Sequence, residues 1–356
     1  MNNNKLFVIA SLLVLLLLSN ACVNRDIQIE KGRGISCPTG MVVSAHPLAS
    51  DIGAEVLIDG GNAYDAATAT AFALAVCYPT AGNIGGGALM VIRQKDGAVA
   101  SLDCREKAPS QAVRDMYLDD TGNIIDGMST STAAASGVPG SVAGIIEMHS
   151  RYGSLPFASV IQPAIDMARE GFPITRKQAA SLNRARDRFI ERNDHKVPFV
   201  KDSLWKKGDM LVQEELALTL EKIRDKGIDG FYKGITADRI VAEMKKDNGL
   251  IDHKDLENYR PVWREPLTGS YSVYKIISMP PPSSGGVALL QLLGIMDLEL
   301  RNEPVFHSLQ DVHLIVEAER RVYADRAYYL GDPDFVDIPL DTLVSSEYLR
   351  KRMADY

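Results

Sequence analysis

The sequence contains few of the residues on which metal and disulfide chemistry depend. Only four of its 356 residues are Cys and six are His, and they form no Cys-x-x-Cys pair and no Cys/His cluster with zinc spacing. Cys37, Cys77 and Cys104 follow Cys22, and three thiols cannot all pair with one another. Cys77 ends an apolar run and is interpreted as a small buried hydrophobe, whereas a Cys37–Cys104 disulfide stays an open alternative. We therefore expect neither a metal site nor a cofactor.

The chain also lacks an excess of positive charge. Its formal net charge is −7, so no basic stripe is available to neutralise the phosphates of a nucleic acid. Short basic runs such as Arg184–Arg188 and Lys206–Lys207 are mixed with acids and are interpreted as solvated helix faces. We find no internal repeat, low-complexity tract or second domain linker. These features argue against a nucleic-acid partner and predict one layered α/β domain.

Long hydrophobic runs are absent except at the N-terminus. The apolar run over residues 6–18 is shorter than the roughly 20 residues that span a bilayer, and it has the length of a signal-peptide core. Ser19-Asn20-Ala21-Cys22 follows, and a small residue before Cys is similar to the lipobox of bacterial lipoproteins, whose Cys thiol carries diacylglycerol. An ordinary secretory signal with a chance Cys is the alternative. The sequence thus predicts a periplasmic or cell-envelope lipoprotein, anchored in the membrane through Cys22, with a signal peptide over residues 1–21, a tether over 22–40 and a domain over 41–356.

Hydrophobic periodicity predicts strands on both sides of a large helical middle. Gly60-Gly61 stops one helix, and Asp252 is expected to cap a single helical turn. Gly82–Gly87 leads into a strand and lacks the Lys-Ser/Thr of a P-loop, so it predicts close backbone packing and positive φ rather than a nucleotide site. The expected strands cover residues 41–44, 88–92, 99–103, 267–271 and 273–278; the expected helices cover 50–59, 62–78, 142–150, 157–170, 176–193, 213–226, 236–246, 255–259, 287–298, 309–329 and 346–353.

Arg105 is the residue with the clearest binding chemistry. It follows an expected strand, and its planar guanidinium suits bidentate binding of a carboxylate. Asp103 and Glu106 lie beside it, and a salt bridge with one of them is the interpretation that the residues alone favour. Ser283-Ser284 stands between Pro and Gly, outside any Gly-x-Ser-x-Gly pattern, and predicts a helix cap rather than a nucleophile.

Several short segments, taken in their order and spacing, resemble the γ-glutamyltranspeptidase family over residues 41–356. No single segment is specific, but their combination is. The matching segments are Ala45–Asp51, Gly60–Ala66, Gly82–Gly87, Arg105–Pro109, Met116–Asp120, Ser136–Gly140, Phe231–Gly234, Pro280–Gly286, and Tyr323–Arg326 with Gly331–Phe335.

The resemblance implies an N-terminal-nucleophile hydrolase fold, an αββα sandwich in which two sheets lie between helices. In such a family a precursor cuts itself into a large and a small subunit, and the new N-terminal Thr of the small subunit is the nucleophile, with its own amine as base. Its implied substrates are glutathione and related γ-glutamyl compounds. The implied acceptors are an amino acid, a peptide amine or water.

The resemblance also implies roles for individual residues. Arg105 would hold the α-carboxylate of the glutamyl group, which reverses the salt-bridge interpretation, and Glu106 would orient Arg105. No catalytic residue is expected within this chain, because a Thr-Thr-His-type stretch would follow Tyr356. The sandwich would then be incomplete without the small subunit.

Three explanations stay open: a fragment, which we favour; a separately encoded small subunit; or a non-catalytic exported lipoprotein that binds γ-glutamyl compounds or a protein. A cephalosporin-acylase-like activity is a further alternative, although Arg105 favours a glutamyl substrate.

Overall fold

A computed structural model describes residues 37–299 and 308–356. The predicted signal peptide, Cys22 and most of the predicted tether lie outside the described residues. The structure divides at residue 41 into a short N-terminal unit and a body that runs from Val42 to Tyr356. No helix within the described ranges is long and apolar enough to cross a membrane.

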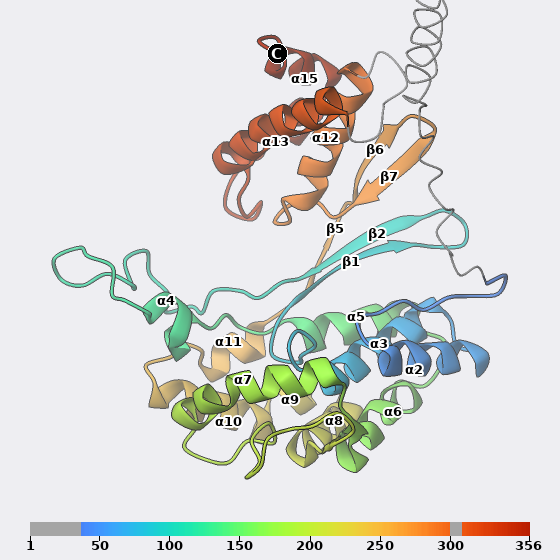
Figure 1. Cartoon of the computed structure of the whole chain (residues 1–356). Helices are drawn as coiled ribbons and strands as arrows, with labels where there is room; N and C mark the ends of the chain where they lie inside the picture. Colours follow the sequence, from blue (N-terminus) through green and yellow to red (C-terminus); the bar gives the residue numbers. More distant parts are fainter. Residues whose placement is uncertain (1–36, 300–307) are drawn as a thin grey trace, which may run out of the picture. The chain divides into compact units, whose positions relative to one another are not determined.

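A three-stranded antiparallel sheet carries the residue with the predicted binding chemistry. Strand β1 (Ala88–Arg93) pairs with β2 (Val99–Cys104), and β2 pairs with β5 (Val262–Arg264) on its other side. The last four residues of β2 are buried, because this strand is central and lies against a helical layer. Figure 1 shows β2 beside β1 and β5, and Arg105 directly follows the last residue of this buried, doubly paired strand.

Four helices form the layer beside this sheet, and Figure 1 shows them together below β1 and β2. Helix α2 starts with Pro47 at its first turn, where proline suits the helix backbone. Helix α3 starts with a capping box, in which Asn62 accepts from the main chain and Asp65 reaches back. Its many small residues allow close packing. The four helices are α2 (Pro47–Ile58), α3 (Ala63–Cys77), α5 (Ser141–Tyr152) and α6 (Phe157–Glu170).

Two glutamines from later parts of the chain close the C-terminal end of α3. Gln178 Nε2 donates to the Cys77 carbonyl at 2.7 Å, and Gln213 Nε2 donates to the Val76 carbonyl at 2.8 Å. Gln213 is buried. The last carbonyls of a helix have no partner within the helix, so these side chains satisfy groups that would otherwise lose hydrogen bonds on burial.

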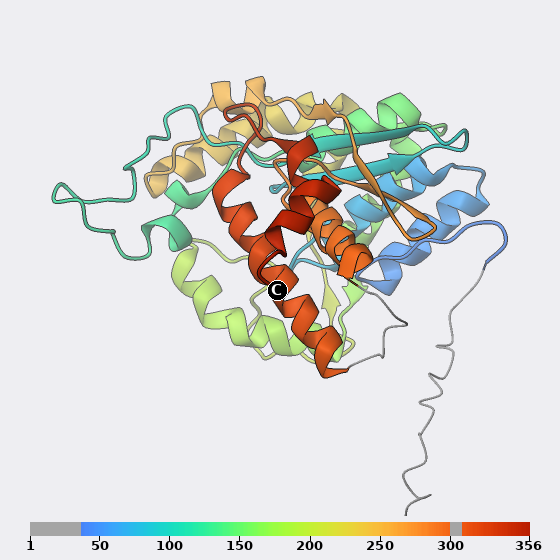
Figure 2. The same ribbon diagram turned by 90° about the horizontal axis from the view of Figure 1, so that it is seen from above.

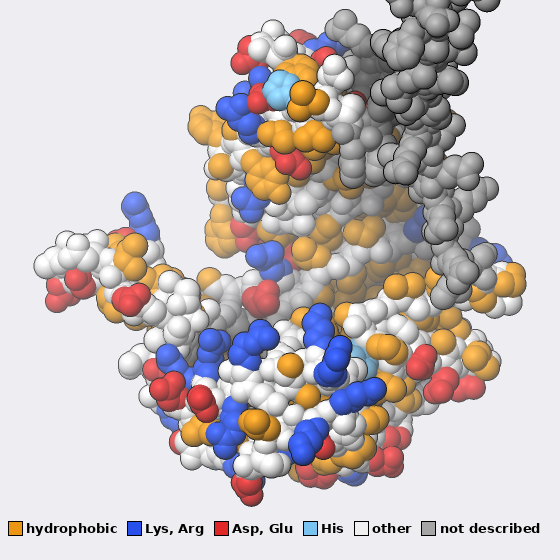
Figure 3. Space-filling model, viewed as in Figure 1, with side chains coloured by type: hydrophobic (Ala, Val, Ile, Leu, Met, Phe, Trp, Pro, Cys, Tyr) orange, Lys and Arg blue, Asp and Glu red, His pale blue; other side chains and the backbone are white. Residues whose placement is uncertain are grey.

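The helical middle surrounds the main hydrophobic core, which extends from Ala49 to Tyr259. The exposed side of α7 is basic: Arg184 and Arg188 are exposed, as the solvated-face interpretation predicted, and Figure 3 shows Lys and Arg side chains gathered over this region. The elements of this middle part are α7 (Arg176–Arg192), α8 (Glu214–Lys226), α9 (Asp229–Tyr232), α10 (Gly234–Lys246) and α11 (His253–Asn258), with the short pair β3 (Phe172–Pro173) and β4 (Met210–Leu211).

The C-terminal part has a small core of its own. The hairpin of β6 (Leu267–Tyr271) and β7 (Tyr274–Ser278) contacts α12 (Gly285–Glu299), and α12 packs against α13 (Leu309–Tyr329) and α15 (Ser346–Arg352) (Figure 2). Its buried residues are Ile295, Leu314, Ala318, Val322, Leu349 and Met353. Short helices α4 (Met128–Ser131) and α14 (Leu340–Leu343) and the turn η1 (Ala133–Ala135) complete the described elements.

The structure confirms the mixed α/β class and most of the expected elements. Helix α6 has the predicted bounds, and Asp252 caps α11 through a capping box. The expected strand over residues 41–44 is wrong, because this segment has no regular structure and pairs with none of the described strands. Strand β5 was not predicted, since three residues carry too little periodicity to stand out.

Candidate functional site

The main chain of Arg105 is fixed on both sides while its side chain is exposed. Its amide donates to Asp103 Oδ1 at 3.0 Å. Its carbonyl accepts a 2.8 Å hydrogen bond from the hydroxyl of Tyr259, a residue that is buried. Because both main-chain groups are held, the guanidinium projects from a defined point at the end of β2.

Tyr259 belongs to a buried pair of phenols. Its ring stacks on Tyr232 with centroids 5.9 Å apart, and the Tyr232 hydroxyl donates to the Pro139 carbonyl at 2.8 Å. Burial raises the pKa of both phenols, so both retain the proton that they donate. Gly140 lies against this pair: a Cβ atom there would meet the Tyr259 hydroxyl and the Cys104 carbonyl.

Asp103 is engaged by Arg264, not by Arg105. Arg264 Nε donates to Asp103 Oδ2 at 2.8 Å, and its two Nη atoms each donate to Asp334 at 3.0 Å. Hydrogen bonds with Asp334 and Asp103 raise the pKa of Arg264 in spite of its burial, and Arg264 lowers the pKa of Asp334. Within residues 37–299 and 308–356, Arg105 forms no ion pair with Asp103 or Glu106. The local salt bridge that the residues alone favoured is therefore not formed.

A polar cavity of about 340 Å³ lies beside the Arg105 side chain. Helix α13 contributes Arg326, whose Nε donates to Ser284 Oγ at 3.0 Å. Ser283 Oγ accepts a long 3.4 Å hydrogen bond from the amide of Gly285 at the start of α12, which agrees with its predicted capping role. Among the described residues, no acidic side chain lines the cavity. Its lining consists of Arg105, Pro282, Ser283, Ser284, Arg326, Ala327, Leu330 and Gly331.

The glycine loop before β1 packs closely against the Arg105 segment. A Cβ atom on Gly87 would lie 2.6 Å from Glu106 Oε2 and 2.9 Å from the Cα atom of Arg105. The predicted close backbone packing is confirmed. The predicted positive φ is wrong, because none of the glycines from 82 to 87 has it. The orienting role of Glu106 stays a prediction.

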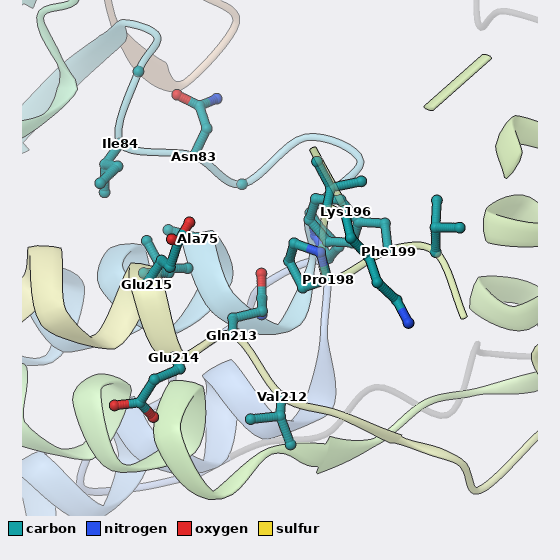
Figure 4. Close-up of a pocket in the computed structure, with 16 residues that line it drawn as sticks. Ala75, Asn83, Ile84, Lys196, Pro198, Phe199, Val212, Gln213, Glu214 and Glu215 are labelled. Atoms are coloured by element: carbon teal, nitrogen blue, oxygen red, sulfur yellow. The ribbon is translucent and has the colours of Figure 1, made fainter. Parts of the chain in front are cut away.

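The same loop borders a second, more apolar cavity of about 740 Å³. Figure 4 shows Asn83 and Ile84 on one side of it, Glu214 and Glu215 at the start of α8, and Pro198 with its neighbours on another side. Its lining is mainly apolar with a few charged side chains, and it contains no Cys, His or Ser. Among the described residues, this cavity therefore lacks a Ser or Cys nucleophile paired with a His base.

The structure also locates the other residues for which the sequence suggested a chemical role. In the described part of the chain, no three His, Cys, Asp or Glu side chains gather as metal ligands. Cys37, Cys77 and Cys104 are free thiols, so the open Cys37–Cys104 disulfide is not formed, and Cys77 is buried as predicted. Sequence reasoning missed Tyr259 and Arg264, which no motif marks, and it quoted Arg326 in the Tyr323–Arg326 segment without placing it beside Arg105.

Comparisons with known proteins identify the family to which this chain is similar. A family described as gamma-glutamyltranspeptidase matches residues 49–355. The glutathione hydrolase proenzyme of Escherichia coli K12 is 44% identical over 318 residues, which are 89% of this chain and 55% of that protein.

Two solved structures are similar in fold. Gamma-glutamyltranspeptidase from Helicobacter pylori has a TM-score of 0.87 and 44% identity, with 90% of this chain and 93% of that chain covered. The enzyme from Pseudomonas nitroreducens has a TM-score of 0.82 and 42% identity, with 90% and 95% covered. The chain thus spans about half the length of the curated relatives that it matches, and nearly the whole length of these solved chains.

Proposed function

The chain belongs to the γ-glutamyltranspeptidase family, and from this premise we propose that it is the large-subunit part of a γ-glutamyltransferase or glutathione hydrolase. In the proposed reaction the γ-glutamyl group of glutathione or a related amide is transferred to water, an amino acid or a peptide amine. The chain contributes the binding site for the glutamyl α-carboxylate, and a small subunit contributes the nucleophile.

The observation that carries this proposal is the state of Arg105. Its main chain is held by hydrogen bonds with Asp103 and Tyr259, yet its exposed guanidinium borders a polar cavity whose described lining has no acidic side chain. A guanidinium binds a carboxylate through two parallel hydrogen bonds, which fixes orientation as well as position. Arg105 is therefore prepared for an external carboxylate rather than for a neighbour in the chain.

The proposed chemistry uses the Thr of a small subunit. Its hydroxyl adds to the γ-carbonyl carbon, the C–N bond of the amide breaks, and the proton from the hydroxyl passes through the Thr amine to the leaving amine. The resulting γ-glutamyl ester is released when water or an acceptor amine attacks the same carbon. The proposed division into subunits is supported by coverage, since the chain matches 55% of the Escherichia coli proenzyme but 93% of the Helicobacter pylori chain.

The exposed edge of β1 supports the proposal that the small subunit packs against the sheet there. Strand β1 lies at an edge of the described sheet, and its residues Leu89 and Val91 are 37% and 45% exposed. They line an apolar cavity of about 640 Å³ together with residues of α3 and α5. An exposed strand edge beside apolar surface is a common place for another strand to add. We propose that the small subunit covers it.

The test compares the chain ending at Tyr356 with the completed protein, which also contains the small subunit, encoded either in the same precursor or separately. We expect the completed protein to release p-nitroaniline from γ-glutamyl-p-nitroanilide and the shorter chain to release none. Arg105→Gln in the completed protein should raise KM about tenfold or more, because a charged hydrogen bond is lost. Arg114→Gln, whose side chain is 96% exposed, is the matched control and should leave KM unchanged. Turnover by the shorter chain, or an unchanged KM for Arg105→Gln, would refute the proposal.

Export and lipidation at Cys22 belong to the same proposal and are supported by the sequence alone. Cys22→Ser should move the protein from the membrane fraction to the soluble periplasmic fraction. Labelling with a radioactive fatty acid checks the modification directly. Membrane association that persists in Cys22→Ser would contradict the lipid anchor.

A further inference from the structure

We propose that Arg326, held by Ser284, is a second carboxylate-binding group in the cavity that Arg105 borders. This inference rests on the proposed function for the identity of its ligand, a γ-glutamyl compound. Arg105 lies at the end of β2 and Arg326 in the last turn of α13, so two distant parts of the chain bring their guanidinium groups to one cavity of about 340 Å³.

The Arg326 side chain is oriented by a neutral partner. Its Nε donates to Ser284 Oγ at 3.0 Å, at the residue before α12 begins. This contact uses one of the five guanidinium N–H groups and satisfies no charge. The Nη atoms keep their donors for a ligand, and among the described residues Arg326 forms no ion pair.

Two acidic residues close to Arg326 in the sequence, Asp325 and Asp334, are engaged by other side chains. Asp325, next to it on α13, is buried, pairs with Arg352 at 3.1 Å and accepts from Gln291 at 3.0 Å. Asp334, in the loop after α13, is held by Arg264 through two hydrogen bonds. The described lining of the cavity thus combines two cations, two hydroxyls and no anion. Like charges that share a cavity are unfavourable, so an anionic ligand is the group that this arrangement stabilises.

The group that we expect Arg326 to bind is a carboxylate, and a γ-glutamyl compound such as glutathione carries two of them. Arg326 can join Arg105 on the α-carboxylate, or it can bind a second carboxylate such as that of the glycine in glutathione. L-Glutamine has only the α-carboxylate, whereas glutathione has both, and this pair of probes separates the two sources.

The experiment is calorimetric titration of the chain with L-glutamine and with glutathione at low salt. The variants are Arg326→Gln and Arg326→Lys, and the control is Arg239→Gln, an exposed arginine on α10. Arg326→Gln should weaken binding about tenfold or more, as expected for a lost charged hydrogen bond. Arg326→Lys should lose less, because it keeps the charge. Equal thermal unfolding midpoints show that the variants are folded.

Equal weakening for both probes places Arg326 on the α-carboxylate, and weakening for glutathione alone places it on the second carboxylate; either result supports the inference. Unchanged binding of both probes in Arg326→Gln overturns it, and so does a wild-type chain that binds neither probe. The proposed function can be refuted independently of this inference. A completed protein without turnover, whose carboxylate binding still depends on Arg326, refutes the activity and leaves this site standing.

Discussion

Arg264 and Asp334 are joined by two parallel hydrogen bonds of 3.0 Å, one from each Nη atom. The third donor of the same guanidinium, Nε, reaches Asp103 at 2.8 Å. Asp103 in turn accepts from the amide of Arg105. One side chain on β5 therefore connects the loop after α13 to the segment that carries the proposed carboxylate site.

Replacing Arg264 should destabilise the fold strongly. Its side chain is 13% exposed and that of Asp103 is 8% exposed, so Arg264→Leu leaves a buried carboxylate without its cation. We expect a loss of about 3 kcal/mol in the free energy of unfolding, measured with urea. Arg264→Lys should lose less, since it keeps a charge near Asp103. The exposed Arg239→Leu is the control, and equal losses for Arg264→Leu and Arg239→Leu would contradict this account.

Gly140→Ala should be poorly tolerated because of the space around it rather than its backbone angles. The new Cβ would meet the Tyr259 hydroxyl and the Cys104 carbonyl, neither of which can move without disturbing the main chain at Arg105. Overpacking of this kind costs about 1–3 kcal/mol in unfolding free energy. Gly85→Ala is the matched control, since nothing lies within 4 Å of its Cβ position. If Gly140→Ala and Gly85→Ala have the same thermal unfolding midpoint, the close contacts at Gly140 do not destabilise the fold and the prediction is wrong.

Asp65 should make the fold sensitive to acid. Burial alone would raise the pKa of Asp65, but hydrogen bonds from Ser154 and from the amides of Asn62 and Leu155 lower it below its usual 3.8. A lowered carboxyl pKa stabilises the fold above the unfolded-state value, and this stability is lost as pH falls through the folded-state value.

The variant Asp65→Asn removes this carboxylate. It should unfold about 2 kcal/mol more easily at neutral pH, and the difference from wild type should shrink below about pH 4. Urea titrations across this range test it, with the exposed Asp51→Asn as control. A difference that stays constant with pH would rule out the carboxylate as its source.

The three described cysteines should differ sharply in reactivity. A hydrogen bond from Thr39 lowers the pKa of the exposed Cys37 thiol to about 7. Burial raises the pKa of Cys77 to about 11 and that of Cys104 to about 12. Because the thiolate is the reacting form, iodoacetamide at neutral pH should alkylate Cys37 first and reach the other two only after unfolding. Peptide mass spectrometry checks this order, and early modification of Cys104 would contradict its buried position.

The sequence predicted local features well, because local chemistry decides them. The cap at Asp252, the helix from 157 to 170 and the strand that follows Gly82–Gly87 all depend on residues within one or two turns. The segment 41–44 was misassigned because its apolar residues suit a strand, yet a strand also needs a neighbour and this one has none.

The site was predicted only in part. Arg105 was identified from its residue type and from the family resemblance, but its support was not. The hydroxyl of Tyr259, the guanidinium of Arg264 and the Arg326 side chain reach this region from more than 150 residues away in the sequence. Spacing within one chain does not encode such contacts, and Asp103 was assigned to its sequence neighbour when its partner lies on another strand.

The two glutamines that close the end of α3 restrict the order in which the protein can mature. The carbonyl of Val76 accepts from the side-chain amide of Gln213, which is synthesised 137 residues later. The carbonyl of Cys77 accepts from the side-chain amide of Gln178, which is synthesised 101 residues later. During translation the helix is therefore complete only after residue 213 has emerged, and until then its frayed end is open to water and to chaperones. Replacing Gln213 would leave the Val76 carbonyl without this partner both during synthesis and in the finished fold, so its effect should be seen in the yield of newly made protein as well as in the stability of the finished fold.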